Sequence, residues 1–179
     1  MIFYVDGACS GNGSTYATGG FGVVGLIDDL GVYYYSKGCQ STTNNREELK
    51  AIIYVLKKFG VKEKIFEQLP EEYYPIVYSD SAYSVNTLTD WIFRWERNNW
   101  LKADNKIPEN LDLIQEYFEL YQKGYRIDLR KVKGHSGNYW NEIADKLAKV
   151  AKEKQDVYEL NMMTKGEMNG EYNSDSNSE

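Results

Sequence analysis

The fold is decided by residues 32–56, VYYYSKGCQSTTNNREELKAIIYVL, in which the hydrophobic pattern changes its period. The first part, VYYYSKG (32–38), is rich in tyrosine and valine and predicts a strand. Further along, apolar side chains recur at helical spacing and share one face, namely Leu49, Ile52, Ile53 and Leu56. We therefore predict a strand followed by an amphipathic helix, whose start can be capped by the side chains of Asn44 and Asn45.

Two further strands are predicted before this stretch. Residues 2–6, IFYVD, predict a short strand that ends at Asp6, and FGVVGLID (21–28) predicts the next one. A loop rich in Gly, Ser and Asn separates the two. A polar turn then leads directly to 32–38, so we expect the first three strands to form an antiparallel meander.

After the helix the chain alternates between strands and helices. The connection 60–75 leads to IVYSD (76–80), a strand that ends at Asp80. The later elements are predicted as short helices at 81–88 and 90–99, a longer helix around 111–121, a strand at 127–132 and a last helix at 143–151. Strand–helix–strand steps require parallel pairing. We therefore expect an α/β fold with a mixed five-stranded sheet, three antiparallel strands and then two parallel ones, and helices on both faces.

The chain of 179 residues is long enough for one domain with a hydrophobic core. We expect this domain to span 1–154 and an acidic, disordered tail to follow at 155–179, where aliphatic side chains are rare. No apolar run approaches the ~20 residues of a membrane helix, and the N-terminus does not resemble a secretory signal. Cys9 and Cys39 form no C-x-x-C pair, so we expect reduced thiols in a cytoplasmic protein that does not bind membranes.

The net charge of −6 is unevenly distributed. Residues 153–179 contain seven acids and two lysines, a charge of −5, which leaves −1 for the rest of the chain. A basic stripe surrounds Asp128 and consists of Lys123, Arg126, Arg130, Lys131 and Lys133. Such a stripe can bind a phosphate backbone on a nearly neutral body, although a solvated strand with its flanking residues has the same composition.

Four acids stand at the ends of predicted strands or near the starts of predicted helices. Asp6 and Asp80 end two strands, and sites in open α/β sheets form beyond the carboxyl ends of strands. Glu48 and Asp145 lie near helix starts, where an acid can simply complement the helix dipole. A divalent cation would compensate several converging carboxylates, and an all-oxygen ligand set favours Mg²⁺ or Mn²⁺. With one His and two separated Cys in the chain, zinc is not expected.

Four motifs in order make the chain resemble type 1 ribonuclease H. YVDGACSGNG (4–13) is similar to the family's first-strand motif. TTNNREELKA (42–51) is similar to the segment whose glutamate, here Glu48 and not Glu47, is a metal ligand. VYSDSAY (77–83) is similar to the motif around the third acid. VKGHSGNYWNEIADKLA (132–148) is similar to the most specific motif, which holds a histidine and the fourth acid.

The resemblance, which covers residues 1–152, implies an endoribonuclease. It would hydrolyse the RNA strand of RNA–DNA hybrids by a two-metal-ion mechanism and leave 5′-phosphate and 3′-hydroxyl ends. Asp6 would bridge two Mg²⁺ ions, with Glu48 and Asp80 on one and Asp145 on the other, and Mn²⁺ could substitute. His135 would assist proton transfer or product release. The partner is expected to be an RNA–DNA hybrid, and the chain is expected to act as a monomer.

The resemblance also implies which residues face each strand of the substrate. The RNA strand, which its 2′-hydroxyls distinguish from DNA, would be lined by Gly7, Cys9, Asn12, Asn44 and Glu48. The DNA strand would face Asn45, Trp91 and Trp95, and Thr43 and Asn110 would form a pocket for a DNA phosphate. Ordinary structural roles are the alternatives, since Asn110 can cap the helix that it opens and the two tryptophans can belong to the core.

A few positions depart from the family pattern. Ala82 stands where many members have Gln, and the basic residues of the handle segment 95–106 are offset by Glu96 and Asp104, which predicts weaker hybrid binding. Three alternative functions stay open at this point: another nuclease or strand-transfer enzyme of the same fold, a non-catalytic hybrid-binding module, and a detached reverse-transcriptase ribonuclease H domain. The motif at 132–148 argues against the first, and the presence of all four acids argues against the second.

Overall fold

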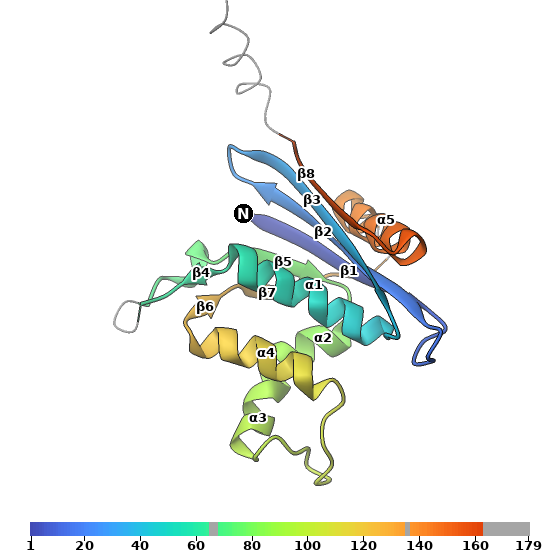
Figure 1. The fold of residues 1–179 in the computed structure, drawn as a ribbon. Helices are drawn as coiled ribbons and strands as arrows, with labels where there is room; N and C mark the ends of the chain where they lie inside the picture. Colours follow the sequence, from blue (N-terminus) through green and yellow to red (C-terminus); the bar gives the residue numbers. More distant parts are fainter. Residues whose placement is uncertain (65–67, 135–136, 163–179) are drawn as a thin grey trace, which may run out of the picture.

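The sheet has six strands in the order β7-β5-β1-β2-β3-β8 (Figure 1). The computed structural model describes residues 1–64, 68–134 and 137–162. The antiparallel meander is formed by β1 (Ile2–Ser10), β2 (Thr18–Ile27) and β3 (Gly31–Gln40). Parallel pairing adds β5 (Ile76–Ser79) to β1, and then β7 (Asp128–Lys131) to β5. The predicted mixed α/β architecture is therefore confirmed.

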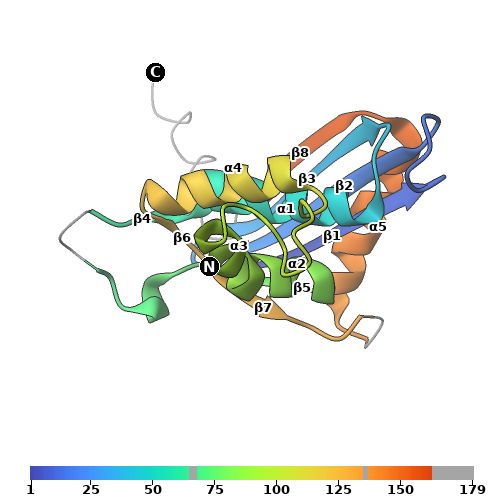
Figure 2. The ribbon, with the colours of Figure 1, turned by 90° about the horizontal axis from the view of Figure 1, so that it is seen from below.

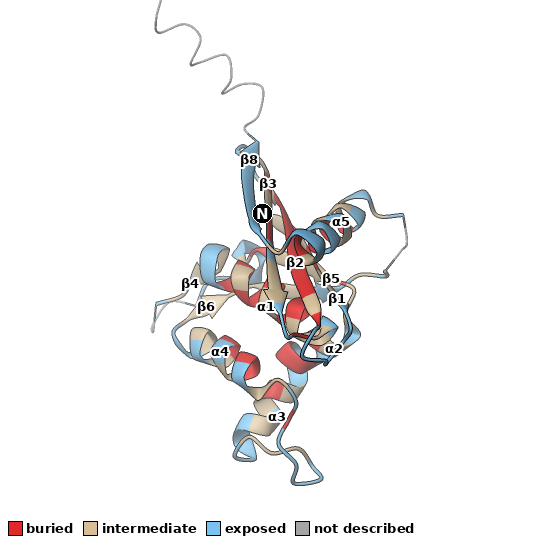
Figure 3. Ribbon diagram, turned by 45° about the vertical axis from the view of Figure 1, so that its right-hand side comes forward, coloured by how far each residue is buried: buried red, intermediate tan, exposed pale blue. Residues whose placement is uncertain are grey.

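The sixth strand, β8 (Val157–Met162), differs from the prediction of five strands and of a disordered tail that begins at 155. It pairs antiparallel with β3 at the edge of the sheet, and its residues are exposed on both faces (Figure 3). A strand without a buried face shows no alternating pattern, so the sequence could not reveal it. Glu159 anchors the strand, because it accepts a hydrogen bond of 2.8 Å from the hydroxyl of Tyr33 and pairs with Lys58. Residues 163–179 lie outside the described part of the chain.

Helix α5 (Tyr139–Lys154) packs very closely on one face of the sheet. A Cβ atom added to Gly22 of β2 would lie 2.4 Å from the carbonyl oxygen of Ala144. At Gly20 it would lie 2.6 Å from the backbone nitrogen of Lys152. The facing side chains of α5 are small and fully buried, as at Ala148 and Ala151. Glycine in the strand and alanine in the helix therefore bring the two backbones together, which is a close-packed contact without large side chains.

Helix α1 (Asn44–Phe59) covers the opposite face and buries the predicted apolar stripe, including Ile52 and Leu56. The hydroxyl of Thr43 caps its start by accepting a hydrogen bond of 3.2 Å from the backbone nitrogen of Arg46. Thr43 thus has the role that the sequence suggested for Asn44 and Asn45. Helix α4 (Leu111–Gln122) packs beside α1 and contributes Ile114 to the same core.

The segment after β5 is helical almost throughout and lies on the α1 side of the sheet (Figures 1 and 2). It consists of α2 (Ala82–Asn86), a π-helical turn (Thr87–Trp91) and α3 (Ile92–Arg97). The smaller elements are β4 (Val61–Lys62), which pairs with β6 (Tyr125–Arg126), and a 3₁₀ turn (Glu71–Tyr73). None of the helices in the described ranges is long and apolar enough to cross a membrane.

Candidate active site

The parallel register of β1 and β5 places Asp6 beside Asp80. The last paired residues are Val5 and Ser79, so the next residue of each strand carries a carboxylate at the same edge of this pairing. β1 itself does not end at Asp6 as predicted, because its pairing with β2 continues to Ser10. Asp6 therefore lies within a strand, on a rigid backbone, rather than at the start of a loop.

A close approach between α1 and β1 adds Glu48 to the two aspartates. A Cβ atom added to Gly7 would lie only 2.5 Å from the backbone nitrogen of Glu48, so no other residue fits there without moving the helix. Carboxylate oxygens of Asp6, Glu48 and Asp80 lie within 4.8 Å of one another. The structure thus brings together three of the four predicted metal-binding acids.

These carboxylates lie in an environment that disfavours their charged form. Asp6 is 7% exposed and Glu48 8%. Burial raises the pKa of Asp6 to about 7; the hydrogen bond with Glu48 opposes this shift, and the charges of Asp80 and Asp145 add to it. Burial, followed by the charge of Asp6, also raises the pKa of Glu48 well above its usual range. Among the described residues, the buried Oε2 of Glu48 has no hydrogen-bond partner. Several close carboxylates and an unpaired oxygen fit a hard divalent cation.

Asp145 is the fourth predicted ligand, and it does not belong to this cluster of three. It lies in α5, and its carboxylate accepts a hydrogen bond of 2.6 Å from Lys149 Nζ, one helical turn further along. Its charge nevertheless contributes to the raised pKa of Asp6, so the two carboxylates are neighbours. Asp145 lies near the site with its charge paired elsewhere.

His135, the predicted proton-transfer residue, lies outside the described residues. The residue before it is described: a Cβ atom added to Gly134 would lie 2.7 Å from Oδ2 of Asp80. The chain segment that leads to His135 therefore passes directly over Asp80. Asp80 and Gly134 line a hollow of about 270 Å³, together with residues 131–133.

Hydrogen bonds tie two of the residues predicted to face RNA, Asn12 and Cys9, to the segment at the start of α1. The backbone nitrogen of Asn44 donates to Oδ1 of Asn12 over 2.8 Å. The thiol of Cys9 donates to the carbonyl oxygen of Thr42 over 3.5 Å. With Gly7 packed against the backbone of Glu48, the predicted RNA-facing residues of β1 and of the loop after it lie close to the first turn of α1.

The residues predicted to face DNA come from three separate segments. Thr43 caps α1, and Asn45 lies half-buried in the first turn of that helix. Trp91 and Trp95 are also half-buried, with their ring centroids 5.8 Å apart. Asn110 precedes α4 with a left-handed backbone, φ 59°, and its side chain makes no capping hydrogen bond. Asn110 therefore occupies the N-cap position of α4, as the alternative expected, but its side chain does not cap the helix.

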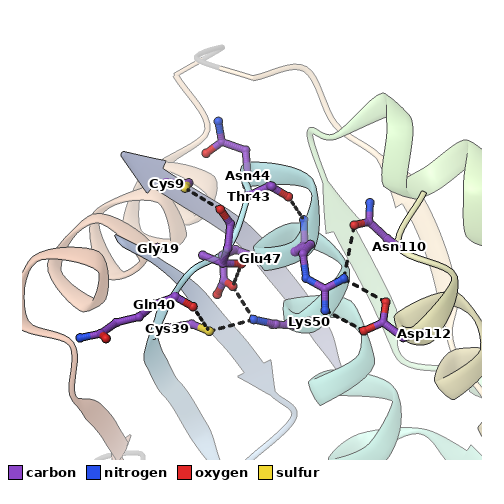
Figure 4. Close-up of polar contacts among 12 residues, drawn as sticks. Cys9, Gly19, Cys39, Gln40, Thr43, Asn44, Glu47, Lys50, Asn110 and Asp112 are labelled. Carbon is purple, nitrogen blue, oxygen red and sulfur yellow. Dashed lines mark hydrogen bonds and ion pairs between the residues drawn. The ribbon is translucent and has the colours of Figure 1, made fainter. Parts of the chain in front are cut away.

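The sequence did not identify Glu47 as part of this region. Its side chain is 0% exposed, and its Oε1 accepts hydrogen bonds of 2.6 Å from the Thr42 hydroxyl and from Lys50 Nζ (Figure 4). Lys50 Nζ also donates to the sulfur of Cys39 over 3.1 Å. The helical i, i+3 spacing of Glu47 and Lys50 is the signal that could have indicated this pair.

The basic stripe around Asp128 is less available to phosphates than its composition suggests. Arg126 forms an ion pair of 3.2 Å with the buried Glu63, and its guanidinium lies 3.9 Å from the centre of the Tyr121 ring. Arg130 pairs with Asp128 at 2.5 Å. Just before the handle segment, Arg94 pairs in the same way with Asp90. Much of this positive charge is thus neutralised within the chain.

Comparison with known proteins gives consistent matches. A family model described as RNase H matches residues 1–153. Ribonuclease H of Chlorobium phaeovibrioides is 40% identical over 156 residues, which cover 87% of this chain and 97% of that protein. Ribonuclease HI of Haemophilus ducreyi is 42% identical over 147 residues, which cover 82% of this chain and 86% of that protein.

Solved structures agree with these matches. LC9-RNase H1, described as a type 1 RNase H with the type 2 active-site motif, aligns with a TM-score of 0.71 and 28% identity, over 90% of this chain and 76% of that one. The foamy viral protease-reverse transcriptase in complex with an RNA/DNA hybrid aligns with a TM-score of 0.69 over 86% of this chain, but at 16% identity it shares only the fold. The family match over residues 1–153 and the relatives at 40% identity or more show that this chain belongs to the ribonuclease H family, whose members hydrolyse the RNA of RNA–DNA hybrids with divalent metal ions.

Proposed function

We propose that this chain hydrolyses the RNA strand of RNA–DNA hybrids and leaves a 5′-phosphate and a 3′-hydroxyl. The observation that carries the proposal is the convergence of Asp6, Glu48 and Asp80 within 4.8 Å in a chain whose relatives are ribonuclease H enzymes. The buried, unpaired Oε2 of Glu48 supports it, since a cation would satisfy this atom.

Asp6, Glu48 and Asp80 would hold Mg²⁺, for which Mn²⁺ is the expected substitute, and Asp145 is the proposed fourth ligand. Bound divalent cations supply an activated water and stabilise the leaving oxygen of an in-line displacement. The chain itself fixes the carboxylates on β1, α1 and β5, and keeps Asp6 and Glu48 buried. Without a cation the charged forms of these two acids are disfavoured, because burial raises both pKa values. His135 is proposed to assist proton transfer or product release.

The surface around these acids would bind the two strands of the hybrid differently. Gly7, Cys9, Asn12 and Asn44 would line the RNA strand, which agrees with the hydrogen bonds from Asn44 to Asn12 and from Cys9 to Thr42. Asn45, Trp91 and Trp95 would face the DNA strand, and Thr43 and Asn110 would contact one of its phosphates. The enzyme is proposed to be a cytoplasmic monomer with its catalytic domain at residues 1–154.

Cleavage of a labelled RNA–DNA hybrid in the presence of Mg²⁺ tests the proposed function. The wild-type chain is expected to cut the RNA strand of the hybrid and to leave double-stranded RNA and double-stranded DNA intact. Asp80→Asn is expected to lose activity by roughly a hundredfold or more, since it removes a charge that faces the reacting phosphate. An inactive wild type or a fully active Asp80→Asn variant would overturn the proposal.

Lys149→Met is expected to lower the Mg²⁺ concentration needed for half-maximal activity. The substitution frees the Asp145 carboxylate from its ion pair with Lys149. The pair is exposed, so we expect a change of roughly twofold to fivefold. Lys146→Met, which removes the same charge from an exposed position of α5, is the matched control. Equal changes in the two variants would show that net charge alone, and not the release of Asp145, governs the effect.

A further inference from the structure

Four of the five residues that we propose to face the DNA strand lie in three segments that are far apart in the sequence. Thr43 belongs to the start of α1, Trp91 and Trp95 to the segment around the π-helical turn, and Asn110 to the residue before α4. A pocket for one phosphate requires that groups from these segments keep fixed distances from one another. Two residues to which neither the motifs nor the resemblance gave a role, Arg46 and Tyr83, connect them.

Arg46 connects the starts of α1 and α4. Its backbone nitrogen donates to Oγ1 of Thr43 over 3.2 Å, and its Nη1 donates to Oδ1 of Asn110 over 3.4 Å. Its Nη1 and Nη2 also donate to the two carboxylate oxygens of Asp112, over 2.9 and 2.7 Å. Figure 4 shows Thr43, Asn110 and Asp112 on either side of the gap between the two helices. Because this bidentate ion pair with Asp112 neutralises the guanidinium, Arg46 holds the two helix starts at a fixed distance and is not a mobile phosphate-binding cation.

Tyr83 connects Asn110 with the tryptophans. Its hydroxyl accepts a hydrogen bond of 2.9 Å from Nδ2 of Asn110 and donates to the carbonyl oxygen of Glu109 over 3.4 Å. Its ring meets the ring of Trp91 edge to face, at 6.5 Å between centroids and 68° between planes. Trp91 in turn contacts Trp95. One side chain therefore joins the proposed phosphate contact to the proposed aromatic contact.

The hydrogen bonds within this network occupy the acceptor oxygens of Thr43 and Asn110 and leave a hydrogen-bond donor of each side chain available. The Thr43 hydroxyl accepts from Arg46, and in the described part of the chain it donates to no other group, so its hydrogen remains available. The Oδ1 of Asn110 is occupied by Arg46, while Nδ2 has two hydrogens and gives only one to Tyr83. A threonine hydroxyl and an asparagine N–H remain, which is the set of groups that an anionic phosphodiester accepts from.

We propose that Arg46 and Tyr83 form one positioning unit, which directs the Thr43 hydroxyl and the Asn110 amide at a single phosphate of the DNA strand and couples that contact to Trp91. The unit rests on the proposed function, since it assumes a hybrid as the ligand. It binds no reacting atom, so its loss weakens hybrid binding and leaves the chemical step intact. Asn110 has a left-handed backbone, which asparagine tolerates better than most residues, and its two side-chain hydrogen bonds fix the direction of its amide.

The test compares Tyr83→Phe with the wild type on a hybrid whose DNA strand carries one neutral methylphosphonate linkage, placed at each position in turn. Tyr83→Phe keeps the ring against Trp91 and removes the hydroxyl. On the unmodified hybrid we expect KM to rise roughly threefold to tenfold, with kcat within about twofold of the wild type. For the wild type, one linkage position is expected to raise KM by a similar factor. In Tyr83→Phe the same linkage should add little, because the phosphate contact is already lost.

The controls separate this inference from the proposed function and from folding. Tyr54→Phe, which removes a hydroxyl that is hydrogen-bonded to Tyr33 and Lys58, should leave the linkage profile unchanged. Arg46→Lys keeps the positive charge but cannot form the bidentate hydrogen bonds of the guanidinium. It replaces Tyr83→Phe in the comparison of linkage positions if Tyr83→Phe does not fold. Two results would overturn the inference. In the first, the increases in KM caused by Tyr83→Phe and by the methylphosphonate multiply at every linkage position. In the second, Tyr83→Phe lowers kcat and leaves KM unchanged. A wild type that cuts no hybrid refutes the proposed function instead, and the same comparison is then made on the Kd of the hybrid.

Discussion

Asp6→Asn is expected to abolish hybrid cleavage and at the same time to stabilise the metal-free protein at pH 8. Asp6 lies at the centre of the three acids, so its loss should lower activity by roughly a thousandfold or more. The same substitution is expected to increase stability, because the folded state holds the negatively charged Asp6 near two other carboxylates that repel it. An amide of the same shape removes the repulsion.

The pH dependence follows from the raised pKa of Asp6, about 7 in the folded protein against an ordinary value of 3.8. A group whose folded pKa is raised adds stability at low pH, and this contribution is lost as the pH increases from about 4 to about 7. Above that range the charged cluster opposes folding. The wild type should therefore lose stability relative to Asp6→Asn between pH 5 and pH 8, by a few kcal/mol at most, since the nearby Glu48 also has a raised pKa and contributes to the same titration.

Thermal unfolding in a chelator, at pH 5 and at pH 8, measures this difference. Asp90→Asn is the control, because Asp90 is exposed and its pKa is lowered by the hydrogen bond with Arg94. Addition of Mg²⁺ should raise the unfolding temperature of the wild type at pH 8 and have little effect on Asp6→Asn. A variant that retains a tenth of the activity, or that is the less stable protein at pH 8, would contradict the argument.

Among substitutions that add one methyl group to the sheet, Gly22→Ala is expected to lower the free energy of unfolding the most. The added Cβ would lie 2.4 Å from the carbonyl oxygen of Ala144 and 2.8 Å from the backbone nitrogen of Ala148, so α5 as a whole must move. Such overpacking costs about 3 kcal/mol, or more where backbone cannot yield. Gly22 also pairs with Asp6, and α5 carries Asp145, so the displacement reaches the site directly.

Chemical denaturation and hybrid cleavage together measure both consequences of Gly22→Ala. A misplacement of the acids by about 1 Å would reduce activity by roughly a hundredfold. Gly13→Ala is the matched control, because nothing lies within 4 Å of its added Cβ and only its left-handed backbone, φ 78°, is strained. That strain costs about 1–2 kcal/mol. If the two variants lost the same stability, the close packing of α5 would not be the cause.

The sequence predicted the parts of this protein that follow from local pattern or from the family motifs. The meander, α1 with its buried stripe, and the convergence of Asp6, Glu48 and Asp80 are examples. It failed where long-range contacts override local preference. Asn110 has the residue type of a helix cap, yet Arg46 and Tyr83 hold its side chain instead. The pairing of Asp145 with Lys149 depends on rotamers that spacing alone does not determine.

The edge strand β8 was missed for a different reason. Its stability comes from backbone pairing with β3 and from Glu159, and neither leaves a hydrophobic period in the sequence. The same limit applies to Glu47, for which the sequence indicated no role although its side chain is fully buried against Thr42 and Lys50. In both cases polar residues have a defined place in the fold that the hydrophobic pattern of the sequence does not indicate.

The position of β8 also determines where additional sequence can be attached to this domain. Ile2, Leu26, Val32 and Met162 form one row across four strands, so the first and the last strand of the described chain begin and end about 14 Å apart. Asp6 lies in a different row, with Gly22, Ser36 and Tyr158. A fusion partner, an affinity tag or a linker to a neighbouring module would therefore leave the sheet from the end remote from the start of α1.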